Sequence, residues 1–317
     1  MKRIAATALL CLCACAGGVR VEVDPDGGDA PDGGDAGIPD AGLPDAGAPD
    51  AGTPDAGVPD AGVPDAGFDP RTWRPPSKGL WIWYFTYTGL TPAQAAQRAK
   101  DMGISYVLIK SGQDGNYWSA RYNAATVGEF TSRGIKVFAW PYITPANIPA
   151  AIDAAALAAQ VPGTSGLVLD VEIEFEKDPS AAAHAQQLCQ GIRAKVPGVF
   201  LGYTSFGWVG YHGPFPFKTF DQYCGDAFFP QIYWSDRGVS WEYGYNQAMQ
   251  MLAAAKLKAP VWIIQSNDDT PSKTAPSTAD LNAFFDRSGA YSSLWELPAS
   301  SYPDKHTQLP LLHWANP

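Results

Sequence analysis

Short apolar runs alternate with helical patterns through most of the chain, and this alternation constrains the fold more than any other feature. Strand patterns occur at 79–85, 106–110, 135–140, 166–173, 199–205, 227–234, 260–266 and 293–298. Helical patterns separate them at 91–103, 122–134, 145–160, 180–196, 217–224, 245–258 and 277–289. Eight strands with seven helices over about 230 residues predict an α/β chain folded as a (β/α)8 TIM barrel. A doubly wound open sheet is the alternative, but no Gly-rich phosphate turn follows the first strand.

The first part of the chain has a different character. Residues 1–15, MKRIAATALLCLCAC, combine a basic start with a short apolar run, which is typical of a secretory signal peptide. The sequence around Cys15 resembles the lipobox of bacterial lipoproteins, with Leu12 at −3 and Ala14 at −1. We therefore predict a lipoprotein signal peptide ending at the lipidated Cys15. An ordinary signal peptide that contains cysteines is the alternative.

Residues 16–77 predict a disordered acidic tether. Six copies of PDAG recur at a five-residue period between Pro39 and Gly67. The repeat carries no aromatic residue and almost no large apolar one, so it cannot bury enough surface to offset its ordering entropy. We assign residues 78–317 to the barrel.

The tether also explains the acidity of the chain. Residues 1–67 hold 12 of the 32 acidic residues and three of the 22 basic ones. The remainder has 20 acidic and 19 basic residues, a net charge near −1. The barrel thus lacks the basic excess typical of proteins that bind nucleic acid, and we expect no nucleic-acid partner.

The predicted fourth strand runs into an acidic stretch. In LVLDVEIEFE (167–176), a carboxylate stands at every second position from Asp170 to Glu176. Side chains alternate between the faces of a strand, so the four acids share one face. Catalytic groups of such barrels lie at the carboxyl ends of the strands. We therefore expect Asp170 and Glu172 to point into the mouth of the barrel. Glu174 and Glu176, beyond the strand, should line the rim or face solvent.

Two inward carboxylates about 6.5–7 Å apart along a strand suit glycoside hydrolysis, where one donates a proton and another stabilises positive charge. Crowding in a partly apolar mouth should raise the pKa of one of them, as a general acid requires. The alternative is that Asp170 and Glu172 are structural, held by Arg, Lys or backbone donors.

Aromatic residues gather at the same ends of the other predicted strands. Flat apolar faces with polar handles stack on sugar rings, and neighbouring amide and carboxyl groups suit sugar hydroxyl and acetamido groups. The candidate substrate-binding residues are Trp81, Tyr203, Gln231, Tyr233, Trp234, Trp295 and Glu296.

The segment 78–298 resembles glycoside hydrolase family 25, the N-acetylmuramidase-type lysozymes. Residues 170–172, Asp-Val-Glu, are similar to the Asp-x-Glu pair of that family's fourth strand. YVLIKSGQDG, GIKVFAWPYI, GYTSFGW and SLWELP are similar to its second, third, fifth and last strands. The first strand departs from the family, with Trp81 near the position where the family has an Asp.

The resemblance implies roles for individual residues. Glu172 would be the general acid, and Asp170 would orient the acetamido group of the substrate or stabilise the oxocarbenium-like centre. Tyr203 and Tyr233 would border the scissile sugar.

Other chemistries find little support in the sequence. The four histidines have no metal-ligand spacing, and no Ser-His-Asp order or Walker-type loop occurs, so we expect neither a metal nor a cofactor. Cys189 and Cys224 remain in the mature chain, in an oxidising compartment. They could form a disulfide between the fourth helix and the segment before the sixth strand, or remain two buried thiols.

The sequence therefore predicts an exported glycosidase, lipid-anchored to the bacterial cell envelope, at the outer membrane or cell surface. Its partner would be an extracytoplasmic polysaccharide such as peptidoglycan or another amino-sugar polymer, and we expect a monomer that meets the membrane only through its lipid. A non-catalytic carbohydrate-binding barrel and a scaffold that presents a barrel to a protein partner are the alternatives.

Overall fold

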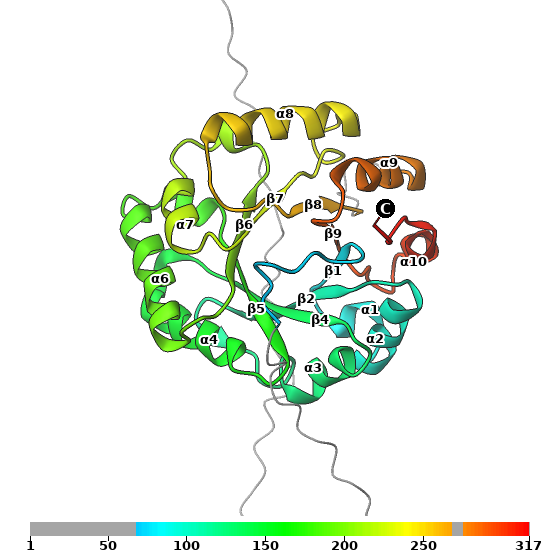
Figure 1. Cartoon of the computed structure of the whole chain (residues 1–317), viewed down its shortest axis with the longest axis horizontal. Helices are drawn as coiled ribbons and strands as arrows, with labels where there is room; N and C mark the ends of the chain where they lie inside the picture. The colour runs from blue at the N-terminus through cyan, green and yellow to red at the C-terminus, as the bar shows by residue number, and fades with distance from the viewer. Residues whose placement is uncertain (1–67, 268–274, 317) are drawn as a thin grey trace, which may run out of the picture. The chain divides into compact units, whose positions relative to one another are not determined.

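The computed structural model describes residues 68–267 and 275–316, and the predicted TIM barrel is confirmed there. Eight parallel strands follow the order β1-β9-β8-β7-β6-β5-β4-β2, and pairing of β1 with β2 closes the sheet (Figure 1). β3 adds a short antiparallel edge to β2. The strands are Gly79–Ile82 (β1), Tyr106–Gln113 (β2), Asn116–Tyr117 (β3), Lys136–Tyr142 (β4), Thr164–Asp170 (β5), Leu201–Phe206 (β6), Phe228–Gln231 (β7), Ile263–Ser266 (β8) and Ser292–Trp295 (β9).

The helices surround the strands in Figure 1. They are Phe85–Thr88 (α1), Pro92–Asp101 (α2), Ala124–Thr131 (α3), Ile148–Ala159 (α4), Ile173–Lys177 (α5), Ala181–Lys195 (α6), Phe217–Tyr223 (α7), Trp241–Ala255 (α8), Thr278–Ser288 (α9) and Pro303–Gln308 (α10), with 3-10 turns at Pro145–Asn147 (η1), Val209–Tyr211 (η2) and Leu309–Leu311 (η3). Polar caps begin several of them: Thr91 and Gln94 form a capping box at α2, and the Ser277 side chain accepts from an amide at α9. Within the described ranges, no helix is long and apolar enough to cross a membrane.

Two apolar layers hold the barrel together. The outer layer, between strands and helices, includes Leu167 and Leu169 of β5. The inner layer fills the barrel with large aromatic rings, among them Trp81, Tyr106, Phe138, Trp140, Phe229 and Trp262. Glycine is required beside these rings, because a Cβ at Gly79 would lie 2.1 Å from the Tyr106 ring. The barrel interior is thus a packed core, and ligands can reach only its ends.

The acidic segment departs from its predicted conformation. Our strand prediction ran to residue 173, but β5 ends at Asp170. Val171 N still donates to Thr204 O of β6, and helix α5 then begins directly after Glu172. The prediction that strand alternation continues from Asp170 to Glu176 was therefore wrong beyond Asp170. The distance between Asp170 and Glu172 that we predicted from strand geometry does not apply either.

Residues 68–77, which we assigned to the tether, pack on the barrel. The Trp73 ring lies 5.8 Å from that of Tyr106 and 6.5 Å from that of Trp262, at the amino-terminal end of the strands. Arg71 forms an ion pair of 3.0 Å with Asp226. This segment contains Phe68 and Trp73, so unlike the aromatic-free repeat it has apolar surface to bury. The predicted signal peptide, Cys15 and the PDAG repeat lie outside the described residues.

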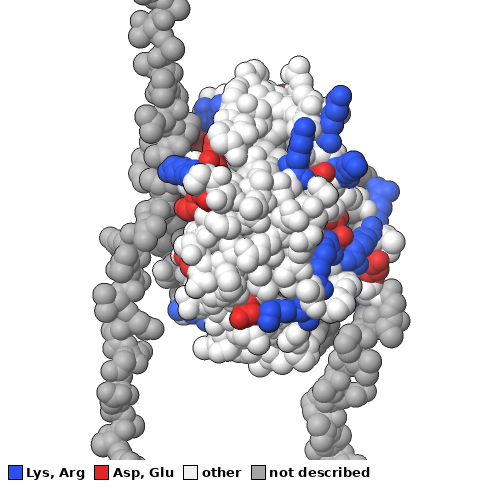
Figure 2. Space-filling model, turned by 90° about the vertical axis from the view of Figure 1, so that its left-hand side faces the viewer, with Lys and Arg blue, Asp and Glu red and all other residues white. Residues whose placement is uncertain are grey.

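Cys189 and Cys224 form a disulfide, the first of the two alternatives left open by the sequence. Cys189 lies in α6 and Cys224 directly follows α7, and both are fully buried. The bond therefore joins two consecutive outer helices on one side of the barrel. That side is shown in Figure 2, where charged side chains lie around the border and the middle is largely uncharged.

Candidate active site

Asp170 and Glu172 meet at the carboxyl end of β5. Asp170 is the last residue of the strand and is only 7% exposed, whereas Glu172, at the start of α5, is half-buried. Both carboxyl groups contact the same atom, Gln231 Nε2, at 3.5 Å from Asp170 Oδ1 and 2.8 Å from Glu172 Oε1. The turn between β5 and α5 thus brings the two acids to one side chain.

The electrostatics of the pair favour the protonated forms. Burial raises the pKa of Asp170 well above its ordinary value, and the adjacent charge of Glu172 raises it further. Burial also raises the pKa of Glu172, although the hydrogen bond from Gln231 opposes that shift. The pair can therefore hold a proton at a pH where ordinary carboxylates have lost theirs.

Gln231, at the end of β7, fixes the position of the pair. Its Nε2 donates to Glu172 Oε1 at 2.8 Å and lies 3.5 Å from Asp170 Oδ1 and 3.3 Å from Thr204 Oγ1. Thr204 in turn donates to Phe229 O at 2.8 Å. Strands β5, β6 and β7 are paired side by side, and the residues at their carboxyl ends form one connected polar network.

Lys110, in β2, brings a positive charge into the same mouth and is only 6% exposed. Its Nζ lies 4.9 to 5.9 Å from the ring centroids of Trp83, Tyr84, Trp118, Trp140 and Tyr142. Burial lowers the pKa of Lys110, and the charge of Asp170 is the largest opposing effect. Reciprocally, Lys110 lowers the pKa of both Asp170 and Glu172. This aromatic cage holds a cation opposite the acids.

The two remaining acids of the segment are half-buried and hydrogen-bonded at the rim. Glu174 Oε2 accepts from the Tyr142 hydroxyl at 2.8 Å, and the charge of Glu174 raises the pKa of Asp170 and Glu172. Glu176 Oε2 lies 2.7 Å from His212 Nδ1. The expectation that both lie beyond the strand is confirmed, and Glu174 couples electrically to the acid pair.

Four of the predicted substrate-binding residues gather around the acids. Gln231 contacts both acids, and the pKa of Tyr233 is raised by burial and then by the charges of Glu172 and Asp170. The half-buried Trp295 packs 5.4 Å from Trp140, and the charge of Glu296 acts on both Lys110 and Tyr233.

Three predicted contact residues lie elsewhere. Trp81 is 1% exposed inside the barrel and donates to Ser293 Oγ at 2.9 Å, beneath the mouth. Tyr203 points outward, since it packs on Phe220 and Phe228 in the layer between strands and helices. Trp234 is buried and donates to Gln265 Oε1 at 3.2 Å, and α8 crosses it so closely that a Cβ at Gly244 would lie 2.5 Å away. Contact of these three rings with a sugar in the mouth is therefore not supported.

Sequence reasoning missed Lys110 and Trp118. A charged residue directly after the apolar run YVLI was the one available sign for Lys110, because a buried parallel strand tolerates a lysine only near its carboxyl end. Trp118 had no comparable sign, since its position depends on the β3 hairpin. Tyr142, the last residue of β4, is one of the aromatic residues expected at the strand ends.

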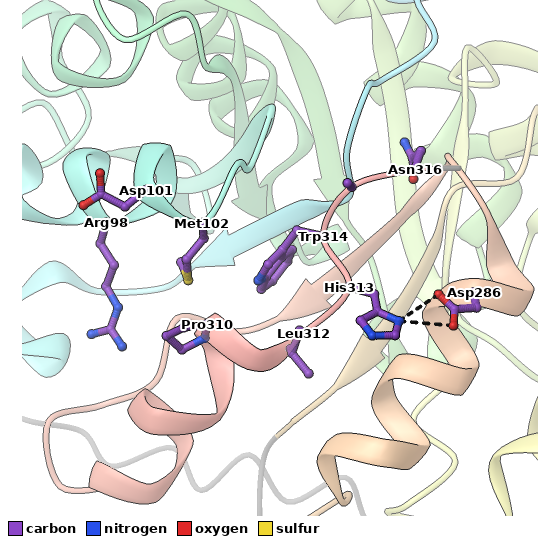
Figure 3. Close-up of a pocket in the computed structure, with 10 residues that line it drawn as sticks. Arg98, Asp101, Met102, Asp286, Pro310, Leu312, His313, Trp314 and Asn316 are labelled. Atoms are coloured by element: carbon purple, nitrogen blue, oxygen red, sulfur yellow. Dashed lines mark hydrogen bonds and ion pairs between the residues drawn. The ribbon is translucent and has the colours of Figure 1, made fainter.

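Within residues 68–267 and 275–316, no group of three or more His, Cys, Asp or Glu side chains is placed to hold a metal ion. A hollow of about 810 Å³ lies at the opposite, amino-terminal end of the barrel, between α2, α9 and the C-terminal segment (Figure 3). His313 and Asp286, 3.2 Å apart, lie on one side of it, and Arg98 and Asp101 lie on the other. This hollow is separated from the acids by the filled barrel interior.

Comparison with known proteins gives no family assignment: no protein-family model and no curated protein matches the chain. Among solved structures, a chitinase of Ipomoea carnea is 10% identical with a TM-score of 0.49, over 73% of this chain and 99% of the chitinase. A GH18 chitinase of Pseudoalteromonas aurantia is 13% identical with a TM-score of 0.47, over 69% and 94%. The catalytic domain of a mannanase of Streptomyces sp. SirexAA-E is 12% identical with a TM-score of 0.48, over 69% and 74%. At these scores the argument for function rests on the site itself.

Proposed function

We propose that this protein is a glycoside hydrolase that acts on a polysaccharide with the Asp170–Glu172 pair. One observation carries the proposal: two carboxyl groups with raised pKa values, both in contact with Gln231 Nε2, lie at the carboxyl end of a TIM-barrel strand, in a mouth lined with aromatic rings. A general acid for glycosidic cleavage needs a raised pKa, and sugar rings need flat apolar walls.

The two acids would divide the work according to their exposure. Glu172 is half-buried and can reach a glycosidic oxygen, so it would donate the proton to the leaving group. Asp170 lies at the end of β5 and contacts the same Gln231 amide as Glu172. Asp170 would set the orientation of Glu172 and keep a proton in the pair during the cleavage step.

The shared contact of the two acids bears on the reaction. Because Gln231 Nε2 touches both carboxyl groups, at 3.5 and 2.8 Å, Asp170 and Glu172 would act together as one proton-donating unit on one side of the sugar. An acetamido group on the substrate would then stabilise the developing positive charge, which favours amino-sugar polymers, peptidoglycan among them.

The N-terminal sequence supports a location outside the cytoplasm. MKRIAATALLCLCAC would direct export, Cys15 would carry a lipid, and the PDAG repeat would hold a monomeric barrel away from the membrane. The anchor would lie in the bacterial cell envelope, at the outer membrane or cell surface. A polysaccharide of that environment would then be the natural ligand.

The test is product analysis with the mature chain. The protein is incubated with peptidoglycan, chitin oligosaccharides and hyaluronan, and new reducing ends are measured and the fragments identified by mass spectrometry. Fragments that require Glu172 support the proposal. Tight binding of a polymer without any cleavage would replace it with the carbohydrate-binding barrel.

A further inference from the structure

An arginine lies on a pair of aromatic rings at one rim of the mouth. The guanidinium carbon of Arg121 is 4.8 Å from the Tyr84 ring centroid and 5.3 Å from that of Trp118. The two rings are themselves stacked, with centroids 5.4 Å apart. Tyr84 follows β1 and Trp118 follows the β2–β3 hairpin, so this first stack belongs to the β1–β2 side of the mouth.

A second stack of the same kind involves Arg237. Its guanidinium carbon is 4.6 Å from the Trp208 ring centroid and 4.8 Å from that of Tyr211. Tyr211 is 52% exposed, and Gln247 Nε2 donates to its hydroxyl at 2.8 Å. Trp208 and Tyr211 follow β6 and Arg237 follows β7, so this stack belongs to the β6–β7 side.

The strand order places the two stacks across the mouth from each other. Around the closed sheet, β4 and β5 separate β2 from β6 on one side, and β8 and β9 separate β7 from β1 on the other. The Asp170–Glu172 pair lies at the end of β5, between the two stacks. A linear polymer that passes over the acids from one rim to the other would contact both stacks.

Arg121 and Arg237 are exposed, and neither takes part in an ion pair among the described residues. Three other arginines of the described chain do form ion pairs: Arg71 with Asp69 and Asp226, Arg133 with Glu129, and Arg193 with Asp226. A guanidinium that stacks by its face keeps its N–H edge free for a carboxylate, which it can bind with two parallel hydrogen bonds.

We propose that the polymer bound across the mouth is anionic, and that Arg121 and Arg237 each bind a carboxylate of it while the stacked rings contact its sugars. The inference rests on the proposed function, because it names the class of substrate for the same mouth. The carboxylates would bind at the rims, where the arginines are, and the uncharged glycosidic linkage would lie over the acid pair. An amino-sugar polymer with carboxylates on alternate units can place its carboxylates at the two arginines and an uncharged linkage over the acid pair.

The experiment measures binding of two matched probes to the mature chain by calorimetry at low and at physiological salt. The probes are hyaluronan oligosaccharides and the same oligosaccharides with their carboxyl groups reduced to alcohols. We expect the acid form to bind at least 10-fold more tightly, with an affinity that falls as salt rises. Arg121→Gln and Arg237→Gln should each weaken binding of the acid form by about 10-fold and leave binding of the reduced form unchanged.

Arg287→Gln is the matched control, since Arg287 also lies on a tyrosine ring, 5.4 Å from Tyr245, but in the last turn of α9 at the other end of the barrel. It should bind the acid form as the parent does. Equal binding of both probes by the parent, or parent-like affinity in both rim variants, would overturn the inference. If the parent binds the acid form more tightly, and the rim variants lose that preference, but no polymer is cleaved, the inference stands and the hydrolase proposal fails. The outcome thus distinguishes failure of the inference from failure of the proposed function.

Discussion

Gln231 Nε2 donates a hydrogen bond of 2.8 Å to Glu172 Oε1 across the ends of β7 and β5. The amide is uncharged and does not titrate, so it can hold this oxygen in place without competing for the proton. The bond lowers the pKa of Glu172 against the larger effect of burial, which raises it. One oxygen of Glu172 is thus directed to the protein, and its second oxygen is the natural proton donor.

A variant that lacks the proton of the Glu172 carboxyl group should lose most of the activity. Glu172→Gln keeps the volume of the side chain but cannot deliver a proton, and general acid catalysis contributes about 10²–10⁴-fold. We expect turnover to fall by that factor while the dissociation constant for the polymer changes little. Initial rates and calorimetric binding on the same polymer measure the two effects. Glu176→Gln is the control, because Glu176 pairs with His212 at the rim, and its rate should change only a few-fold.

The raised pKa of Asp170 makes a prediction about stability. The folded state holds the Asp170 proton to a higher pH than the unfolded state, whose Asp pKa is about 3.9. The folded protein therefore loses stability as the pH rises from about 4 through the folded pKa. Asn cannot ionise, so Asp170→Asn should gain stability relative to the parent over that range. Urea unfolding at several pH values measures this, and a stability difference that stays constant with pH would contradict it.

The disulfide should contribute strongly to stability. It closes a loop of 35 residues between two buried positions, for which the loop-entropy model gives about 4 kcal/mol. We expect Cys189→Ala combined with Cys224→Ala to lower the free energy of unfolding by that order, measured by denaturant titration. Thiol labelling of the denatured, unreduced parent should find neither cysteine free; labelling at both would show that the bond is absent in solution.

The lipid anchor is tested by one substitution outside the barrel. If Cys15 is lipidated, Cys15→Ala should move the protein from the membrane fraction to the soluble fraction, because the PDAG repeat offers no apolar surface for the bilayer. Cys13→Ala is the matched control and should stay with the membrane. Membrane partition of Cys15→Ala equal to that of the parent would refute the lipoprotein assignment.

The sequence was most informative where local patterns decide the structure. Strand and helix alternation predicted the barrel, because each element is marked by its own periodicity and caps. The inward direction of Asp170 also followed from strand alternation. The position of Glu172 did not, since it depends on helix α5, which begins at the next residue, Ile173, and ends the strand alternation. Tyr203 was misplaced for a related reason: a tyrosine on a strand suits either face, and only the packing of α7 shows that it faces outward.

Lys110 is the charged residue of the mouth that sequence reasoning missed, and its charge acts on the pKa of both acids. Its charge lowers the pKa of Asp170 and of Glu172, although it stands on a strand that is not adjacent to theirs. Lys110→Met keeps an unbranched chain of similar length within the aromatic cage and removes the charge. Without that charge the acid pair should keep its proton to a higher pH, so the alkaline limb of the pH–rate profile should shift upward. Lys195→Met, which removes an exposed lysine paired with Asp153 on the outer helices, should leave the limb in place. A limb that stays fixed or shifts downward in Lys110→Met would show that the cage does not set the pKa of the acid pair.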